Sequence, residues 1–261
     1  MKKIISLVFI SLIISSSGLH SSEEDVSTIL ITGSNRNIGL EFVKQFSQKG
    51  WRVIATTRSL DSADDLIEFS NKNRNVIVEQ LDITNDAHLQ NLKKKYQDDV
   101  VDILLNNAAY TPRYFSSFRG IEGVDIEATR KSFEVNSIGT MRVIQTFIEN
   151  VERSKSGKIV NLSTKAASFD ERPEIPMMYS YAMSKAALNS MIKTLSFETA
   201  ESNIIVVALS PGIVNTTMGM GLMGAIDIDE SVTKMMLVIE NLSMDQNGLF
   251  LDYEDGRVIE W

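Results

Sequence analysis

Short apolar, β-branched runs alternate with stretches of helical periodicity along most of this sequence. This repetition predicts parallel strands that are joined by crossover helices. We therefore expect an α/β fold, with a single Rossmann-type, doubly wound parallel sheet of about seven strands and helices on both faces, over residues 26–261. The expected strands are residues 27–32, 51–57, 76–82, 101–109, 157–164, 203–212 and 248–253, and the longest expected helices are residues 129–151 and 179–200.

A sheet of this kind binds its ligands beyond the carboxyl ends of the strands, where the direction of winding switches. Residues 110–123 and 217–228 are the least patterned stretches of the sequence, and we expect them to build the substrate pocket. The second stretch contains Met218, Met220 and Met223. Their flexible thioethers either pack internally or line an adaptable, apolar substrate site.

The first 25 residues form a separate segment with the pattern of a signal peptide. Two lysines precede an apolar run from Ile4 to Ile14, and small residues follow. The run is short for a membrane-spanning helix. We expect residues 1–25 to lie outside the fold and to export the protein or tether it to a membrane. The alternative is a buried first helix in a cytoplasmic protein.

The composition excludes several classes of site. The chain has no cysteine, which excludes disulfides, thiolate nucleophiles and cysteine-ligated metals. Its only histidines are His20 and His88, so we expect no metal site and no histidine-dependent triad. We expect His88, on a predicted surface helix, to be solvated. The net charge of −8 argues against nucleic acid as a partner.

The stretch "YSYAMSK", residues 179–185, pairs a phenol with an ammonium group. Tyr181 and Lys185 are four residues apart and share one face of a helix, whereas Tyr179 points elsewhere. A nearby cation stabilises a phenolate and lowers the pKa of the phenol. This spacing favours Tyr181 as a proton donor, although the pattern alone is common.

A glycine-containing turn, "TGSNRNIG" at residues 32–39, follows the first expected strand and opens the first expected helix. Gly33 and Gly39 allow a tight turn and a close approach of a pyrophosphate to the backbone, and the helix N-terminus stabilises its charge. The turn resembles the Thr-Gly-x-x-x-Gly-x-Gly loop of the short-chain dehydrogenase/reductase family. Asn37 replaces the middle glycine, and because asparagine tolerates left-handed backbone angles, we expect the turn to persist.

Further motifs follow in the order of the same family. "NNAA" at 106–109 is similar to Asn-Asn-Ala-Gly, and "NLSTKAAS" at 161–168 resembles the Ser-Ser-x-x-Gly-Ser stretch after the fifth strand. "YAMSK" matches Tyr-x-x-x-Lys, and "SPGIVNT" at 210–216 matches the Pro-Gly turn beside the nicotinamide. The ending "FLDYEDGRVIEW" resembles that of the C-factor/sniffer-like carbonyl reductases. The resemblance covers residues 26–261.

This resemblance implies roles for individual residues. Tyr181 would be the acid/base, Ser168 would donate a hydrogen bond to the substrate oxygen, and Ser163 and Thr164 would mark the end of the strand. Lys185 would lower the pKa of Tyr181 and bind the nicotinamide ribose, and Asn136, in "VNSIG", would hold a water of the proton relay. The implied cofactor site comprises Gly33, Ser34, Asn35, Arg36, Asn37, Ile38, Gly39, Arg58, Asp82, Ile83, Asn107, Ala108, Tyr181, Lys185, Pro211, Gly212, Val214 and Thr216.

The implied activity is hydride transfer between a nicotinamide cofactor and a small-molecule carbonyl or secondary alcohol. Arg58 follows the second expected strand, where NAD-preferring relatives carry an acid, and Arg36 is a second cation nearby. A pair of guanidinium groups suits a 2′-phosphate, so we expect NADP(H) to be preferred, with NAD(H) as the alternative. A further alternative is a cofactor-binding signalling protein with negligible turnover. We also expect a homo-oligomer, either a dimer or a tetramer.

Overall fold

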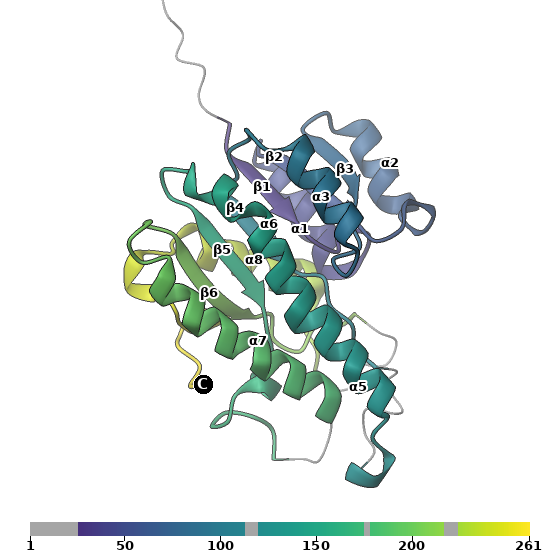
Figure 1. Cartoon of the computed structure of the whole chain (residues 1–261), viewed down its shortest axis with the longest axis vertical. Helices are drawn as coiled ribbons and strands as arrows, with labels where there is room; N and C mark the ends of the chain where they lie inside the picture. Colours follow the sequence, from purple (N-terminus) through teal and green to yellow (C-terminus); the bar gives the residue numbers. More distant parts are fainter. Residues whose placement is uncertain (1–25, 113–119, 175–177, 217–223) are drawn as a thin grey trace, which may run out of the picture.

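Parallel pairing joins all the strands of one seven-stranded sheet, in the order β3-β2-β1-β4-β5-β6-β7. This computed structural model describes residues 26–112, 120–174, 178–216 and 224–261. The sheet confirms the expected Rossmann-type α/β fold (Figure 1). The strands are β1 (Thr28–Ile31), β2 (Arg52–Thr57), β3 (Val76–Gln80), β4 (Ile103–Asn106), β5 (Lys158–Leu162), β6 (Ile205–Ser210) and β7 (Phe250–Asp252).

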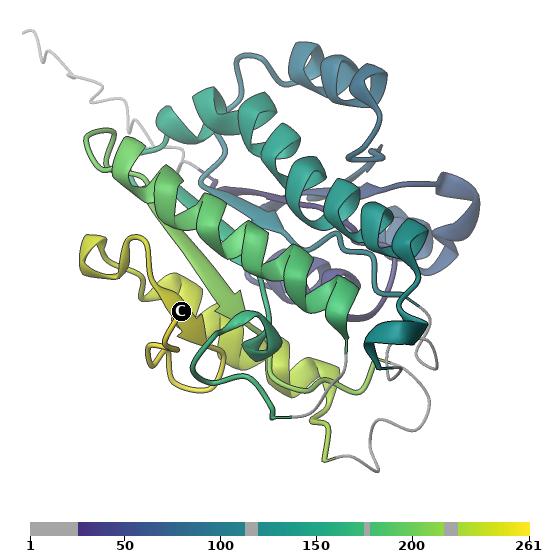
Figure 2. The ribbon, with the colours of Figure 1, turned by 60° about the horizontal axis from the view of Figure 1, so that its bottom comes forward.

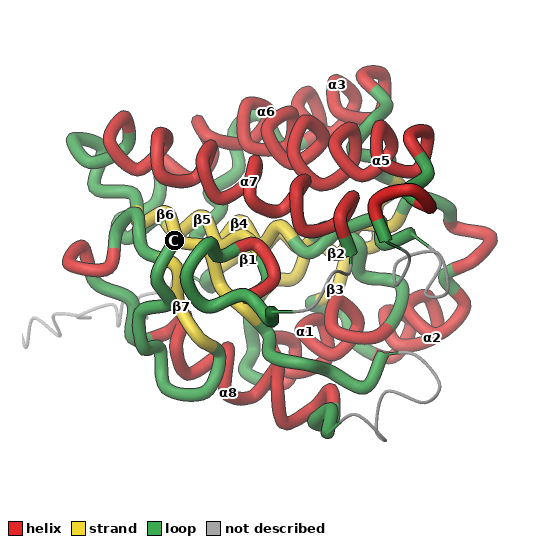
Figure 3. The backbone as a smooth tube through the Cα atoms, turned by 90° about the horizontal axis from the view of Figure 1, so that it is seen from below, coloured by secondary structure: helices red, strands yellow, loops and turns green. Residues whose placement is uncertain are grey.

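Helices cover both faces of the sheet, which is why the central strands are apolar throughout. Ile29 and Ile31 of β1 face one core, while Leu30 faces the other. The first core lies under α1 (Asn37–Gln48), α2 (Asp64–Lys72) and α8 (Ile228–Glu240). The second lies under α3 (Asp86–Lys95), α6 (Thr140–Glu152) and α7 (Tyr179–Glu198). Figure 3 shows these two layers on opposite sides of the strands.

The prediction of a single long helix over residues 129–151 is wrong, because a π-helical turn interrupts it. The structure has α5 (Ile126–Phe133), a π-helical turn (Glu134–Gly139) and then α6. The turn buries Asn136 completely. Single π-helical turns inside helices frequently occur at functional sites.

The winding of the sheet switches between β1 and β4, since β1 pairs with β2 on one side and with β4 on the other. The crevice at the carboxyl ends of these strands is where a doubly wound sheet binds its ligand. The expected signal segment, residues 1–25, lies outside the described residues, as do residues 113–119 and Met218, Met220 and Met223 of the expected substrate pocket. Within the described ranges, no helix has both the length and the apolar character needed to span a membrane.

Candidate active site

The turn between β1 and α1 adopts the geometry that its sequence suggested. Gly33 has φ 68° and Asn37 has φ 49°, both in the left-handed region. Asparagine therefore takes a conformation that glycine usually supplies, and α1 begins at this residue. The replacement of the middle glycine has left the turn intact.

Gly33 and Gly39 are also required by packing. A Cβ on Gly39 would lie 2.2 Å from the carbonyl oxygen of Gly33 and 2.5 Å from Nδ2 of Asn107. A Cβ on Gly33 would lie 2.8 Å from the Cα of Ala108. Both distances are shorter than van der Waals contact, so the turn closes only with glycine at both positions.

Asn107 and Thr32 lock this turn to the end of β4. The Asn107 amide nitrogen Nδ2 donates to the carbonyl oxygens of Thr32 (2.9 Å) and Gly33 (2.8 Å). In return, the Thr32 hydroxyl accepts from the backbone N–H groups of Asn107 (3.1 Å) and Ala108 (3.0 Å). Thr32 is buried, and sequence reasoning missed this role because it depends on a contact with a distant strand. The Asn107 amide thus shapes the cofactor turn.

Both candidate phosphate-binding cations are exposed at this edge. Arg36 directly precedes α1, and Arg58 directly follows the neighbouring strand β2. Ile83, one of the residues of the expected cofactor site, is buried. Its side chain lies so close to Gly139 that a Cβ on Gly139 would be 2.9 Å from it.

Asp82 is held as a carboxylate. Its Oδ1 accepts from the Thr84 backbone N–H (2.9 Å) and hydroxyl (2.7 Å). Burial raises the pKa of Asp82, but the two hydrogen bonds from Thr84 and the charge of Arg58 outweigh this effect and lower the pKa overall.

The expectation that His88 is merely solvated is wrong, because His88 is half-buried and its Nδ1 accepts the backbone N–H of Asp82 at 3.1 Å. His88 therefore helps to fix the strand-end loop that carries Asp82.

Lys185, which is buried, and Tyr181, which is half-buried, lie on the same side of α7. The Lys185 Nζ donates to the carbonyl oxygen of Leu162 at 2.7 Å and lies 6.0 Å from the centre of the Tyr181 ring. Burial lowers the pKa of Lys185 to about 8 and raises the pKa of Tyr181 to about 12. Desolvation thus shifts the pKa of Tyr181 in the direction opposite to the lowering that we expected from Lys185.

Asn136 connects the loop after β4 to α7. Its Oδ1 accepts from the Tyr110 backbone N–H at 2.7 Å, and its Nδ2 donates to the Tyr110 carbonyl and the Ser184 hydroxyl, both at 2.9 Å. Ser184 in turn donates to the carbonyl oxygen of Tyr181 at 2.8 Å. The Asn136 side chain therefore supports the turn of helix that presents Tyr181. Ser184 was missed by the sequence reasoning, although it lies between the two predicted residues.

The hydrogen bonds of Ser168 contradict the prediction that it is the catalytic serine. Its side chain is completely buried, and its hydroxyl donates to the carbonyl oxygen of Glu260 at 2.6 Å. The same oxygen accepts the backbone N–H groups of Asp170 (3.1 Å) and Glu171 (2.8 Å). A hydroxyl whose proton is committed to a backbone carbonyl cannot polarise a substrate. Its spacing to Tyr181 was misleading because the loop between β5 and α7 is long.

Thr164 is the hydroxyl that stands at the end of β5. It is half-buried, begins the short helix η4 (Lys165–Ala167), and accepts the Ala166 backbone N–H at 3.3 Å. The short helix η4 packs against α7, and Leu162, two residues earlier, holds Lys185. The neighbouring Ser163 hydroxyl does not face the site, because Ser163 is buried and donates to Oδ1 of Asn189 at 2.6 Å. The two adjacent hydroxyl residues of "NLST" were the signal that could have pointed to Thr164 as a hydroxyl at the end of the strand.

The turn after β6 is held from two sides. The Ser231 hydroxyl donates to the carbonyl oxygen of Pro211 at 2.7 Å. Gly212 has φ 79°, and a Cβ there would lie 2.6 Å from the ring of Tyr253. At the far end of the turn, Nδ2 of Asn37 lies 3.4 Å from the carbonyl oxygen of Thr216, while Val214 is buried. The turn after β6 thus lies against the turn after β1.

The structure therefore gathers the cofactor turn, Asp82, Tyr181, Lys185 and the Pro-Gly turn around the carboxyl ends of the strands. Figure 2 shows the N-terminal end of α7, the loop after β5 and the segment after β6 on the same side of the molecule. Among the described residues, no group of three acidic or histidine side chains could hold a metal ion.

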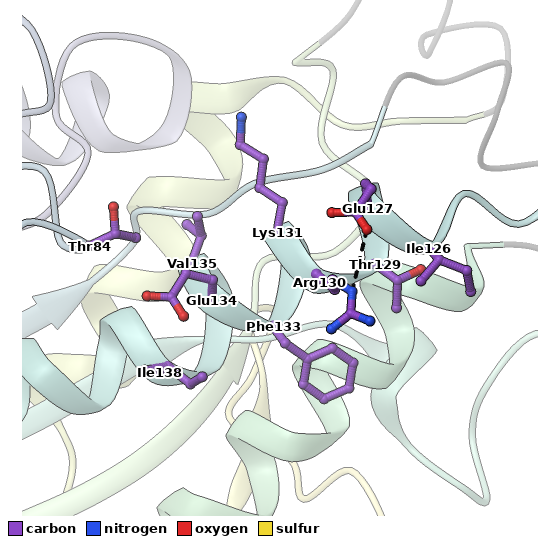
Figure 4. Close-up of a pocket in the computed structure, with 10 residues that line it drawn as sticks. All are labelled: Thr84, Ile126, Glu127, Thr129, Arg130, Lys131, Phe133, Glu134, Val135 and Ile138. Carbon is purple, nitrogen blue, oxygen red and sulfur yellow. Dashed lines mark ion pairs between the residues drawn. The ribbon is translucent and has the colours of Figure 1, made fainter.

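An open hollow on α5 and the π-helical turn is separate from this site (Figure 4). None of the predicted catalytic or cofactor residues lines it. Its lining consists of Thr84, Ile126, Glu127, Thr129, Arg130, Lys131, Phe133, Glu134, Val135 and Ile138.

Comparisons with known proteins agree with this geometry. The sequence profile of the family described as short chain dehydrogenase matches residues 27–225. An uncharacterized oxidoreductase of Schizosaccharomyces pombe is 30% identical over 249 residues, which cover 88% of this chain and 96% of that protein. The NADPH-bound carbonyl reductase from chicken fatty liver is 29% identical and superposes with a TM-score of 0.81, covering 90% of this chain and 99% of the other. The carbonyl reductase Sniffer of Drosophila melanogaster is 26% identical, with a TM-score of 0.79 and coverage of 90% and 100%.

Proposed function

The chain belongs to the short-chain dehydrogenase/reductase family and is an NAD(P)-dependent oxidoreductase, and on this premise we propose that it is an NADP(H)-dependent carbonyl reductase or alcohol dehydrogenase with Tyr181 as its general acid and base. The observation that carries the proposal is the placement of half-buried Tyr181 and buried Lys185 on one side of α7, with the Lys185 ammonium 6.0 Å from the centre of the Tyr181 ring and bonded to the end of β5. A binding module needs no such pair, whereas proton transfer does.

The residues at the strand ends fit a nicotinamide dinucleotide. Gly33 and Gly39 leave no side chain between the turn and a bound group, and the N-terminus of α1 favours the charge of a pyrophosphate. The carboxylate of Asp82 suits adenine, and the Pro211–Gly212 turn suits the nicotinamide. When bound, the cofactor supplies the hydride, and the protein orients and polarises the substrate.

The proton chemistry follows from the side chains of the chain itself. With a pKa of about 12, Tyr181 holds its proton at neutral pH and can donate it to an alkoxide oxygen. Thr164, in place of Ser168, donates a hydrogen bond to the same oxygen and stabilises the charge that develops there. Lys185 holds the end of β5 through Leu162, and its ammonium would bind the ribose of the cofactor. Asn136 and Ser184 keep this turn of α7 in place.

The decisive variant is Tyr181→Phe, which removes one hydroxyl and keeps the ring. Turnover of an accepted carbonyl should fall by about 10² to 10⁴-fold, the usual worth of general acid catalysis, with NADPH binding nearly unchanged. Tyr179→Phe is the matched control, since Tyr179 is the first residue of α7 and lies on another side of it. A substrate panel, followed by NADPH absorbance, comes first. A Tyr181→Phe enzyme that keeps more than about a tenth of the wild-type rate would refute the acid assignment.

The preference for NADP(H) is proposed from Arg36 and Arg58. Both are exposed at the edge where the adenosine ribose would lie, and a guanidinium pair suits a 2′-phosphate. The NADPH in the chicken carbonyl reductase supports the same preference. Arg58→Asp should reverse the preference toward NADH, measured as the ratio of kcat/KM for the two cofactors. Equal or better use of NADH by the wild-type enzyme would contradict the proposal.

We also propose that residues 1–25 export the protein or tether it to a membrane, on the sequence pattern alone. Their deletion should leave cofactor binding intact. Fractionation that recovers full-length protein only from the cytoplasm would reject export and tethering.

A further inference from the structure

The C-terminal segment, residues 253–261, folds back along the last strand. The Ile259 backbone N–H donates to the carbonyl oxygen of Phe250 at 2.7 Å, and the Asp252 N–H donates to that of Arg257 at 2.9 Å. Ile259 is completely buried, and the ring of Trp261 stacks on Phe250 with 5.7 Å between ring centres. The segment is therefore anchored in the core and forms a fixed support for whatever it contacts.

What it contacts is the loop that follows β5. The Phe169 backbone N–H donates to the carbonyl oxygen of Trp261 at 3.0 Å, and the Ser168 hydroxyl donates to that of Glu260 at 2.6 Å. The Glu260 N–H donates in turn to Oε1 of Glu171 at 3.0 Å. Backbone groups of two segments about 90 residues apart in sequence are thus joined directly.

Ion pairs reinforce the same junction. The guanidinium of Arg257 donates one hydrogen bond to each carboxylate oxygen of Glu171, to Oε1 at 3.2 Å and to Oε2 at 2.8 Å, in a bidentate geometry. At the other end of the loop, Lys165 pairs with the buried carboxylate of Asp252 at 2.6 Å. Asp252 is the last residue of β7, the strand that the C-terminal segment folds back along, and Lys165 directly follows Thr164. The end of β7 therefore contacts the residue next to the proposed catalytic hydroxyl.

Ser168 organises the loop from within. Its hydroxyl accepts the N–H groups of Asp170 and Glu171, and its carbonyl oxygen accepts Nε of Arg172 at 2.7 Å. One buried hydroxyl therefore shapes the turn and binds it to the C-terminal segment at the same time.

We propose that the C-terminal segment positions the loop after β5 for catalysis, holding it through Ser168 and the Glu171–Arg257 pair so that the Thr164 hydroxyl keeps its position at the start of η4, which packs against α7. This inference rests on the proposed function, because it assigns the segment to the chemistry of the same site. Ser168, Glu171 and Arg257 act through the loop and are positioning residues. A displacement of about 1 Å at a reacting group can cost about 10²-fold in rate, so a clamp of this kind has a measurable effect.

The test uses full-length Glu171→Ala, Arg257→Ala and the double variant. Both side chains are partly exposed, so the variants should fold. We expect kcat for carbonyl reduction to fall about tenfold, inside the range that misplacement can cost, with NADPH affinity unchanged. The double variant should be no slower than the slower single variant, because the two side chains act as one pair. The conservative Glu171→Asp should retain most of the wild-type kcat.

Amide hydrogen exchange gives a readout that does not depend on activity. The N–H groups of Phe169 and Glu171 should exchange several-fold faster in the single variants than in the wild type. The matched control is Glu68→Ala, which removes an exposed ion pair with Lys72 on α2, far along the sequence from the loop. It should change neither exchange in the loop nor kcat.

Three outcomes would overturn the proposal. Unchanged exchange at Phe169 and Glu171 would show that the pair does not hold the loop. Faster exchange with unchanged kcat would show that the clamp is structural only. Additive losses in the double variant would show that the two residues do not act together. A wild-type protein that binds NADPH but reduces no carbonyl would instead refute the proposed function, and exchange would still report on the clamp.

Discussion

The two strand-to-helix junctions that build the site differ in what holds them. The junction from β1 to α1 is short. Its own residues Gly33, Asn37 and Gly39 meet its backbone requirements, and Asn107 at the end of β4 binds it from outside. The junction from β5 to α7 runs from Ser163 to Met178, and it is held by a segment at the other end of the chain.

This difference explains where sequence reasoning succeeded. A short turn leaves much of its requirement in neighbouring residues, such as glycine where no Cβ fits, even though a distant residue, Asn107, also binds it. A loop that is held from outside leaves no local trace of the residues that hold it. The same motif-based reasoning therefore anticipated the conformation of the turn after β1, but it did not anticipate that the Ser168 hydroxyl is bonded to Glu260.

The largest expected effect concerns that hydroxyl. Thr164→Ala should lower kcat by about 10²-fold, the usual cost of removing one donor to a developing oxyanion, with little change in melting temperature. Thr164→Ser, which keeps the hydroxyl, should restore most of the rate. A Thr164→Ala enzyme as active as wild type would show that Thr164 does not donate a hydrogen bond to the substrate oxygen.

The next effect tests the junction from β1 to α1. Gly39→Ala forces a methyl group against the Gly33 carbonyl and Asn107, and overpacking of this kind typically costs about 1–3 kcal/mol. We expect NADPH affinity and the free energy of unfolding both to fall, as measured by fluorescence titration and urea denaturation. Gly120→Ala is the control, because nothing lies within 4 Å of its Cβ position. A tolerated Gly39→Ala would mean that the turn is looser than its contacts indicate.

Ser168→Ala tests whether Ser168, in the junction from β5 to α7, has a structural role or a catalytic one. Two backbone N–H groups and the Glu260 carbonyl lose their partner, and an unsatisfied buried group costs about 1–3 kcal/mol. We expect the free energy of unfolding to fall by about that amount, measured by urea denaturation, with Ser190→Ala on the exposed side of α7 as a neutral control. A stable Ser168→Ala protein whose kcat is about 10²-fold lower would return Ser168 to the catalytic role.

The smallest effect is a pH dependence of the clamp. The hydrogen bonds from Arg257 lower the pKa of Glu171 from its ordinary value of 4.5 to about 2. A carboxyl group whose pKa is lowered on folding adds stability that is fully present above the unfolded pKa and is lost as pH falls through the folded one. The difference in melting temperature between wild type and Glu171→Ala should therefore be constant from neutral pH to about 5 and shrink between about 4.5 and 2. A difference that disappears already at neutral pH would show that the pair does not form.

The sequence was sufficient for the features that depend on near neighbours. Strands of β-branched residues, the alternation with helices, the glycines of the cofactor turn and the shared helix face of Tyr181 and Lys185 all follow from spacing along the chain. These requirements are met within a few residues, so they can be recognised before the fold is known.

The tertiary structure decided the features that depend on burial or on distant segments. Burial sets the pKa of Tyr181 high, although its neighbour Lys185 suggested the opposite. The Asp82 N–H gives His88 a hydrogen bond that its surface-helix pattern did not predict. The Ser168 hydroxyl donates to the carbonyl oxygen of Glu260, more than ninety residues away in sequence. Thr164 is then the hydroxyl residue that remains at the end of β5. Desolvation and long-range hydrogen bonds arise only when the chain is folded, and for this reason no local pattern could have predicted them.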